Sequence, residues 1–238
     1  MSLPFFYADG KLKEGSVIEP PEDTARHIVQ VLRMREGEAL IITDGRGDSA
    51  RCEISTVSKK NCTLKVGAVI SKPPFKHHIT VAISLLKNAG RFEWFLEKAA
   101  ENGINQIIPL LCERTEKQRF RKDRADSILI SALQQSQQSW LTEINEPIDL
   151  KLFLHRQQDG RKYIAHCLEH DKNPLSRTIN EDDSRSIILI GPEGDFSPDE
   201  IDMALVQGYK PVSLGETRLR TETAGLAAAI LLKQLGSS

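Results

Sequence analysis

The sequence lacks the cysteine patterns that hold structural zinc. Its four cysteines, Cys52, Cys62, Cys112 and Cys167, include no Cys-x-x-Cys pair, and their spacings fit no zinc site. The chain does not open on a charged segment followed by an apolar one, and its longest apolar run, 226–232, is far shorter than the roughly 20 residues that span a bilayer. We therefore expect a cytoplasmic protein with free thiols and no membrane segment.

Three common catalytic motifs are absent as well. The chain has no Gly-x-Gly-x-x-Gly dinucleotide fingerprint, no Gly-x4-Gly-Lys-Ser/Thr phosphate loop and no Gly-x-Ser-x-Gly nucleophile elbow. Lys and Arg together number 32 and Asp and Glu 33, so the chain is not a histone-like polycation. A local basic patch is still allowed, because phosphate binding needs only a few clustered cations.

The N-terminal part of the chain is rich in short β-type segments. Strands are expected at residues 4–7, 38–43, 50–57 and 62–70, with turn-forming stretches between the last three. A helix is expected after Pro21, where apolar residues recur at helical spacing at Ala25, Ile28, Val29 and Leu32. Several short strands in a small region predict a β-barrel.

Prolines at 73 and 74 mark the best linker, because proline cannot continue a central strand. Strand-like and helix-like segments alternate after it. Strands are expected at 79–86, 104–111, 162–167, 186–190 and 211–214, and helices at 91–101, 123–138, 197–207 and 221–235. This alternation predicts an α/β domain with a mostly parallel sheet covered on both faces.

A Gly-Pro-Glu-Gly turn at 191–194 follows the apolar strand expected at 186–190. Ser197 then begins a helix as its N-cap, with Pro198 at the first position and Glu200 at the third, which forms a capping box. Ligands bind at the carboxyl ends of parallel strands, and glycine lets a ligand approach the backbone. The turn is equally compatible with an ordinary connection between a strand and a helix.

A second glycine-bearing loop also follows a strand and opens an apolar helix. It carries Arg218, Arg220 and Glu222 at alternating positions just before that helix. A helix N-terminus presents free N–H groups and partial positive charge, so an arginine there favours an anionic or electron-rich ligand. The alternative is a solvated loop with paired charges. We favour a single pocket between residues 190–194 and 214–221, because both loops join a strand to a helix.

Two other polar features allow more than one interpretation. His77 and His78 lie beside the linker and are expected to be solvated, whereas His166 and Cys167 end a strand and either fill space or line the pocket. Residues 113–124 hold six basic and three acidic side chains with an interleaved phenylalanine. Such a run is usually a solvated face, and RNA contact is the alternative.

Five segments combine into a specific pattern. They are Gly191-Pro192-Glu193-Gly194, Leu214-Gly215-x3-Leu219-Arg220-Thr221-Glu222-Thr223-Ala224, Glu93-Trp94-x3-Lys98-Ala99, Ile107-Ile108-Pro109-Leu110 and His27-x3-Val31-Leu32-Arg33. This pattern resembles that of bacterial 16S ribosomal RNA (uracil-N3) methyltransferases of the SPOUT class, and the likeness covers essentially the whole chain. A departure is Asp195, which stands where the family often has glycine.

The resemblance implies an RNA-binding PUA-like β-barrel at residues 1–72. It implies an α/β methyltransferase domain with a deep trefoil knot at residues 73–238. The implied methyl donor is S-adenosylmethionine, the acceptor is N3 of one uridine in 16S rRNA of the small ribosomal subunit, and no metal is needed. The resemblance also implies a homodimer through the C-terminal domain. The alternatives are a non-catalytic RNA-binding or ribosome-assembly protein and a methyltransferase of this fold that acts on tRNA.

The same resemblance assigns roles to individual residues. The residues expected against the cofactor are Ile190, Gly191, Glu193, Gly194, Leu214, Gly215, Leu219, Arg220 and Thr221. The residues expected against RNA are His27, Arg33, Lys87 and Arg114. Valine at Gly194 is expected to abolish cofactor binding, because its side chain would fill the space that the cofactor needs.

The implied reaction requires removal of the proton on uracil N3, because the protonated nitrogen is a poor nucleophile. Arg220 is the candidate to hold the resulting anion, since a fixed cation with N–H donors stabilises charge that develops in the transition state. Glu222 is the candidate base or orienting group, and Glu193 is the alternative base. Glu222 could equally be a first-turn carboxylate that is stabilised by the helix dipole.

Overall fold

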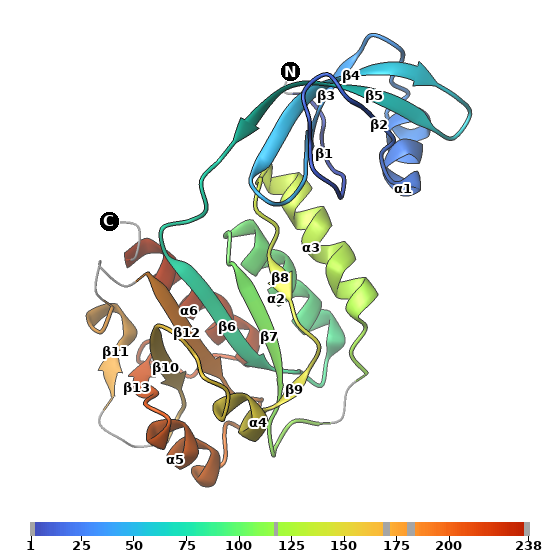
Figure 1. Cartoon of the computed structure of the whole chain (residues 1–238). Coiled ribbons are helices and arrows are strands. Elements are labelled where there is room, and N and C mark those ends of the chain that lie inside the picture. Colours follow the sequence, from blue (N-terminus) through green and yellow to red (C-terminus); the bar gives the residue numbers. More distant parts are fainter. Residues whose placement is uncertain (1–2, 117–118, 169–171, 180–183, 236–238) are drawn as a thin grey trace. The chain divides into compact units, whose positions relative to one another are not determined.

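The computed structural model describes residues 3–116, 119–168, 172–179 and 184–235. The chain forms two compact units (Figure 1). Unit 1 comprises Met1–Pro74 and Ile130–Leu141, and unit 2 comprises Phe75–Leu129 and Thr142–Ser238. The division at residue 72 into two domains stays a prediction.

Unit 1 is built on a five-stranded sheet in the order β1-β3-β4-β5-β2. Its strands are β1 (Phe5–Tyr7), β2 (Val17–Ile18), β3 (Ala39–Thr43), β4 (Asp48–Val57) and β5 (Cys62–Ser71). Strand β1 pairs parallel to β3, and the other pairs are antiparallel. Along β4, Ala50, Cys52 and Ile54 are buried and alternate with exposed residues, so one face of the strand packs on the core.

The helix expected after Pro21 is confirmed only in part. It consists of α1 (Glu22–Arg26) and a π-helical turn, η1 (His27–Val31). The N–H of Leu32 donates to the carbonyl of His27 at 3.0 Å, five residues back, which widens the turn. This extra residue rotates Leu32 off the buried face, and it is 43% exposed. The regular helical spacing of apolar residues that the sequence shows from Ala25 to Leu32 is therefore interrupted at this turn.

Unit 2 confirms the α/β fold with a parallel sheet. Its eight strands follow the order β11-β13-β10-β12-β6-β7-β8, with β9 also paired to β7, and every pairing is parallel. The strands are β6 (His78–Ser84), β7 (Gln106–Leu111), β8 (Glu143–Ile144), β9 (Ile148–Asp149), β10 (Arg161–Ala165), β11 (Asn173–Pro174), β12 (Arg185–Ile190) and β13 (Lys210–Ser213). The sequence missed the two-residue strands β8, β9 and β11, because such short segments carry no periodic pattern.

Helices cover both faces of this sheet. These helices are α2 (Ala89–Glu101), α4 (Leu150–Leu154), α5 (Pro198–Val206) and α6 (Thr221–Leu235), with a 3-10 turn at η2 (Leu175–Arg177). Helix α3 (Lys122–Ser136) begins in unit 2, and its residues from Ile130 onward belong to unit 1. Ala82 of β6 packs in a core cluster with residues of α4 and α5. The next residue, Ile83, faces the opposite side, where a Cβ added to Gly225 of α6 would lie 2.8 Å from it and from Phe95. Glycine at 225 thus lets α6 pack closely on β6 and α2.

His77 corrects the expectation of a solvated histidine pair. Its side chain is buried, and its Nε2 lies 2.8 Å from the hydroxyl of Ser186 on β12. His78 is half-buried, and this burial lowers its pKa. The pair was misjudged because the adjacent prolines suggested a solvated linker, whereas β6 already begins at His78.

No helix in the described residues is both long and apolar enough to cross a membrane. In the same residues, no group of three or more His, Cys, Asp or Glu side chains is arranged to hold a metal ion. The deep knot that the resemblance implies stays a prediction.

Candidate active site

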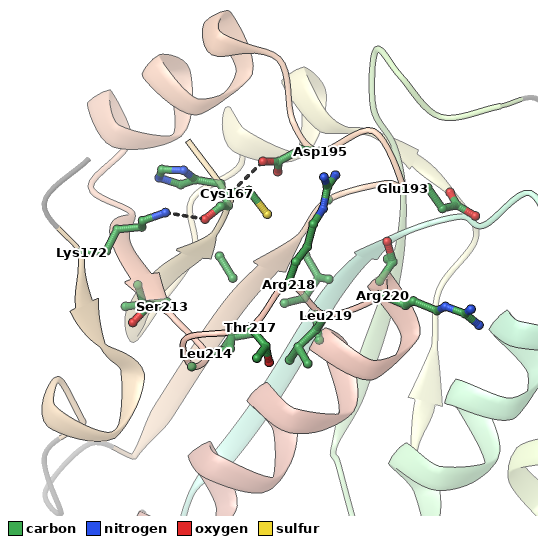
Figure 2. Close-up of a pocket in the computed structure, with 18 of the residues that line it drawn as sticks. Cys167, Lys172, Glu193, Asp195, Ser213, Leu214, Thr217, Arg218, Leu219 and Arg220 are labelled. Carbon is green, nitrogen blue, oxygen red and sulfur yellow. Dashed lines mark hydrogen bonds between the residues drawn. The ribbon is translucent and has the colours of Figure 1, made fainter. Parts of the chain in front are cut away.

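A cavity of about 550 Å³ opens at the carboxyl ends of three neighbouring strands of unit 2 (Figure 2). Its walls come from the ends of β10, β12 and β13, from the loops that follow them and from the first turn of α6. The predicted cofactor residues that line it are Ile190, Gly191, Glu193, Leu214, Gly215, Leu219, Arg220 and Thr221. The two loops that were paired from sequence therefore do form one pocket.

Gly191 is the glycine that this cavity requires. A Cβ added to it would lie 3.1 Å from both the backbone nitrogen and a ring carbon of Phe196, which is tighter than ordinary contact. Phe196 is fully buried in the core under α5 and cannot easily move aside. Gly191 thus allows the loop after β12 to fold tightly while its backbone faces the cavity.

Gly194 has a different position. It is not among the residues that line the cavity, and a Cβ added there would meet the Arg114 side chain at 3.4 Å, an ordinary contact. The Arg114 guanidinium donates to the carbonyl of Gly194 at 2.8 Å and to that of Phe196 at 3.4 Å. We therefore expect Gly191, and not Gly194, to be the position at which valine blocks the cofactor.

Asp195 joins two of the loops that form the cavity. Its Oδ2 accepts from the backbone N–H of Cys167 at 2.7 Å, and its Oδ1 accepts from that of Phe196 at 2.8 Å. The residue has φ of 64°, the left-handed region, which explains why glycine is a natural alternative at this position. Asp195 thus fixes the end of β10 to the loop after β12, a role that the sequence did not suggest.

Lys172 is a second wall residue that sequence reasoning missed. Its ammonium donates to the carbonyls of His166 at 2.8 Å and Leu168 at 2.7 Å, so it holds the chain that leaves β10 (Figure 2). His166 and Cys167 both line the cavity, which was one of the two roles considered for them. Lys172 lies in a polar segment without strand or helix pattern, so no sequence signal marked it.

The two arginines of the loop after β13 point in different directions. Figure 2 shows Arg218 extending toward the loop that carries Asp195, whereas Arg220 extends away from it, on the side where Glu193 lies. Both side chains are exposed. The carbonyl of Arg220 accepts from the N–H of Ala224 at 2.7 Å, so Arg220 stands at the start of α6. The residue therefore stands at a helix N-terminus, and its role in the reaction stays a prediction.

Glu193 projects from the rim of the cavity next to Lys87. One Glu193 oxygen accepts from the backbone N–H of Lys87 at 3.2 Å. The ammonium of Lys87 pairs with Glu116 at 2.9 Å, and this hydrogen bond raises the pKa of Lys87. Lys87 and Glu193 therefore lie together at the carboxyl ends of β6 and β12.

Glu222 faces the α2 side of α6 and is not part of the cavity wall. Its side chain is 9% exposed, and its Oε1 lies 3.8 Å from Nε of Arg91 on α2. Its buried Oε2 has no hydrogen-bond partner in the described structure. Glu222 is thus placed to orient Arg91 and the first turn of α6.

The basic run at 113–124 is mostly engaged in local pairs. Arg121 pairs with Asp123 at 3.1 Å, Lys122 with Asp126 at 2.5 Å and Arg124 with Glu93 at 2.9 Å. Residues 117 and 118 lie outside the described residues. Unit 1 carries the other two predicted RNA-binding residues, His27 and Arg33, which are both exposed.

Two family models match the chain. Residues 73–233 match the RNA methyltransferase domain, and residues 20–67 match the RNA methyltransferase PUA domain. The chain belongs to the RNA methyltransferase family. This membership confirms the resemblance drawn from the five sequence segments. The PUA match covers most of the sheet in unit 1, and the methyltransferase match covers the whole cavity.

Individual members of the family extend the comparison over the full chain. The chain is 28% identical, over 97% of its length and 95% of the relative's, to ribosomal RNA small subunit methyltransferase E of Rickettsia conorii. It is 37% identical to a probable rRNA-methyltransferase from Porphyromonas gingivalis, with a TM-score of 0.89 and 98% of each chain covered. It is 27% identical to ribosomal RNA small subunit methyltransferase E from Neisseria gonorrhoeae bound to S-adenosyl methionine, with a TM-score of 0.88 and 98% of each chain covered.

Proposed function

We propose that this RNA methyltransferase transfers a methyl group from S-adenosylmethionine to N3 of a uridine in 16S rRNA of the small ribosomal subunit, in the cytoplasm. The observation that carries the proposal is the cavity at the carboxyl ends of β10, β12 and β13, built by the loops that carry the family pattern. The relative from Rickettsia conorii is named for methylation of small-subunit rRNA. A solved relative of the same name binds S-adenosyl methionine.

The cavity fits a molecule of this kind. Its volume of about 550 Å³ lies within the usual range for small-ligand pockets. Ile190, Leu214 and Leu219 supply apolar wall for an adenine ring and a thioether chain. Gly191 brings backbone to the cavity wall without a side chain of its own. When bound, S-adenosylmethionine supplies an electrophilic methyl group, so the protein needs only to place the acceptor and remove its proton.

The acceptor step divides among three side chains. The N3 proton of uracil would pass to a carboxylate, and the negative charge that develops spreads onto O2 and O4. The methyl carbon would bond to N3 as its bond to sulfur breaks, with S-adenosylhomocysteine as the leaving group. Arg220 holds that charge with its N–H donors at the start of α6. Glu193 is the better candidate for the base, because it lines the cavity and is exposed. Glu222 orients the first turn of α6 through its contact with Arg91.

RNA is held by basic side chains in both units. His27 and Arg33 serve in unit 1, and Lys87 and Arg114 serve in unit 2; all four are exposed. Lys87 and Arg114 lie next to Glu193 and Gly194, so their contacts would bring an RNA strand to the rim of the cavity. Cations in such positions mostly contact phosphates and position the RNA.

The proposed homodimer uses the exposed part of helix α6. Leu226, Ala227, Ile230 and Leu231 are only half-buried within one chain, although the helix is strongly apolar. Ala228 of the same helix is fully buried, and α6 packs on β6. Side chains left half-covered on one helix can complete their burial against a second copy.

We expect the protein to sediment as a dimer at micromolar concentration and Leu231→Glu to sediment as a monomer that keeps its thermal stability. The change places a charge on the half-buried side of α6 without disturbing the sheet-facing side. Val206→Glu on α5 is the matched control, because Val206 is 82% exposed and should leave the dimer intact. A monomeric wild type in sedimentation velocity would contradict the proposed interface.

The function is tested by supplying labelled S-adenosylmethionine with purified small-subunit RNA, assembled subunits or tRNA. We expect label in 16S rRNA and, by nuclease digestion and mass spectrometry, in 3-methyluridine. Label only in tRNA would contradict the proposed substrate, and cofactor binding without transfer to any RNA would favour a non-catalytic role. Mapping methylated uridines of 16S rRNA in a deletion strain identifies the target uridine, which is the one that loses its methyl group.

A further inference from the structure

An exposed apolar pair lies at the end of the π-helical turn of unit 1. Val31 is 66% exposed and Leu32 is 43% exposed, although the preceding residue on that face, Ile28, is fully buried. The π-helical bond from Leu32 to His27 closes the turn that carries both side chains. Wide turns of this type are rare in proteins overall. Those that do occur are frequently found at functional sites.

The backbone after this pair supports the same outward geometry. Arg33 has φ of 54°, the left-handed conformation that glycine usually supplies at a helix end. The N–H of Met34 donates to the carbonyl of Ile28 at 3.1 Å, which closes the helix end around Arg33. The chain thus keeps an arginine, with its long cationic side chain, where glycine would be less strained.

A second basic segment lies against this turn. The side-chain amide of Gln30 donates to the carbonyl of Lys59 at 3.1 Å, in the turn between β4 and β5. Lys59, its neighbour Lys60 and Arg33 are all exposed. We call the surface formed by Val31, Leu32, Arg33, Lys59 and Lys60 the η1 tip.

The two acidic side chains that closely follow Arg33 in the chain are bonded to backbone groups. One Glu38 oxygen accepts from the backbone N–H of Arg35 at 2.7 Å, and one Glu36 oxygen accepts from that of Val57 at 3.1 Å. The carboxylates are thus aimed at backbone donors. Three exposed cations thus belong to the same two segments as the exposed apolar pair, the π-helical turn and the β4–β5 turn that Gln30 bonds to.

We propose that Val31 and Leu32 form an apolar wedge that packs against an unstacked base of bound RNA, while Arg33, Lys59 and Lys60 hold the flanking phosphates. The inference rests on the proposed function, in that it takes RNA as the ligand of unit 1. Apolar side chains cannot bind phosphate, but they can cover the face of a base that has left its stack. Lysine is depleted in protein–protein interfaces, so the composition of the tip favours nucleic acid.

The test measures the affinity of the full-length protein for a labelled stem-loop of small-subunit rRNA over a series of salt concentrations. For Val31→Ser with Leu32→Ser we expect an affinity loss of about tenfold to a hundredfold at every salt concentration, the usual effect of uncovering two such side chains. The slope of log affinity against log salt should stay the same, because no phosphate contact is lost. For Lys59→Ser with Lys60→Ser the slope should fall by about 1.4 to 1.8 units.

Val17→Ser is the matched control, because Val17 is an apolar residue of the same unit with 60% exposure, outside the η1 tip. It should leave both affinity and slope unchanged. Thermal unfolding and S-adenosylmethionine affinity, measured on every variant, report whether the fold is intact. A stem-loop with 2-aminopurine at successive single-stranded positions should brighten at one position with the wild type and not with the Val31, Leu32 double variant.

The outcomes separate the wedge from the proposed function. Unchanged RNA affinity in the double variant, with a wild type that binds RNA, overturns the wedge and leaves the methyltransferase function standing. A loss of affinity only for assembled subunits, with naked rRNA bound normally, also overturns it and indicates a ribosomal protein as the occupant of the tip. A wild type that binds neither the stem-loop nor assembled small subunits at any salt concentration overturns the proposed function itself.

Discussion

Gly191→Val is expected to abolish measurable binding of S-adenosylmethionine, with an affinity loss of about a hundredfold or more. A Cβ at residue 191 would lie 3.1 Å from the backbone nitrogen of Phe196, and valine adds two methyl groups beyond that atom. Phe196 is fully buried, so the loop after β12 has to move instead. Both the movement and the new side chain take space from the cavity, since Gly191 forms part of its wall.

Calorimetric titration measures the affinity, below the unfolding temperature of each variant. Gly194→Val is the matched control, because the Cβ of residue 194 would only contact the flexible Arg114 side chain at 3.4 Å. We expect that control to bind the cofactor within a few-fold of the wild type. Normal affinity in Gly191→Val, or a larger loss in Gly194→Val, would show that the cofactor does not lie against the loop after β12.

Arg220→Ala is expected to lower the methylation rate by at least about a hundredfold at saturating cofactor and RNA, the typical effect of removing one donor that stabilises transition-state charge. The loss of cofactor affinity should be smaller, because Arg220 extends from the cavity toward the side of Glu193 (Figure 2). Single-turnover rates with labelled S-adenosylmethionine measure the effect. Arg220→Lys should recover part of the rate, since it keeps the charge but not the planar donors.

Arg218→Ala is the control for this second prediction. Arg218 lies in the same loop and is equally exposed, but it extends toward Asp195. Its removal should affect cofactor affinity more than turnover. Near-normal turnover in Arg220→Ala would assign that residue a structural role.

The methylation rates of Glu193→Gln and Glu222→Gln, compared over a pH series, identify the base. The variant that lacks the base should lose less activity at high pH, because hydroxide then replaces the missing base.

Sequence reasoning succeeded where a local pattern has one physical outcome. Ser197, Pro198 and Glu200 form the expected capping box: the Ser197 side chain accepts from the N–H of Glu200, and the Glu200 side chain accepts from the N–H of Ser197. The apolar segment before it became β12, which is buried along almost its whole length. Such features depend on neighbours within a few residues, so the order of the residues is sufficient to predict them.

Sequence reasoning failed where a residue's environment depends on distant parts of the chain. His77 was expected in solvent and is buried against Ser186, which is 109 residues away. Leu32 continues the helical spacing of apolar residues in the sequence, but it is exposed at the π-helical turn, and no spacing rule marks that insertion. The distinction between Gly191 and Gly194 likewise depends on whether Phe196 or Arg114 lies opposite.

By itself, the sequence determined the α/β alternation, the two loops that build the cavity and the family to which the chain belongs. These follow from periodicity, capping and motif spacing, which are local properties. Only the tertiary structure decided that Asp195 joins the ends of β10 and β12, that Glu222 faces Arg91 and that Val31 and Leu32 are exposed. Each of these depends on which segments the parallel sheet and the helix ends bring together, and contacts between distant segments leave no periodic trace in one sequence.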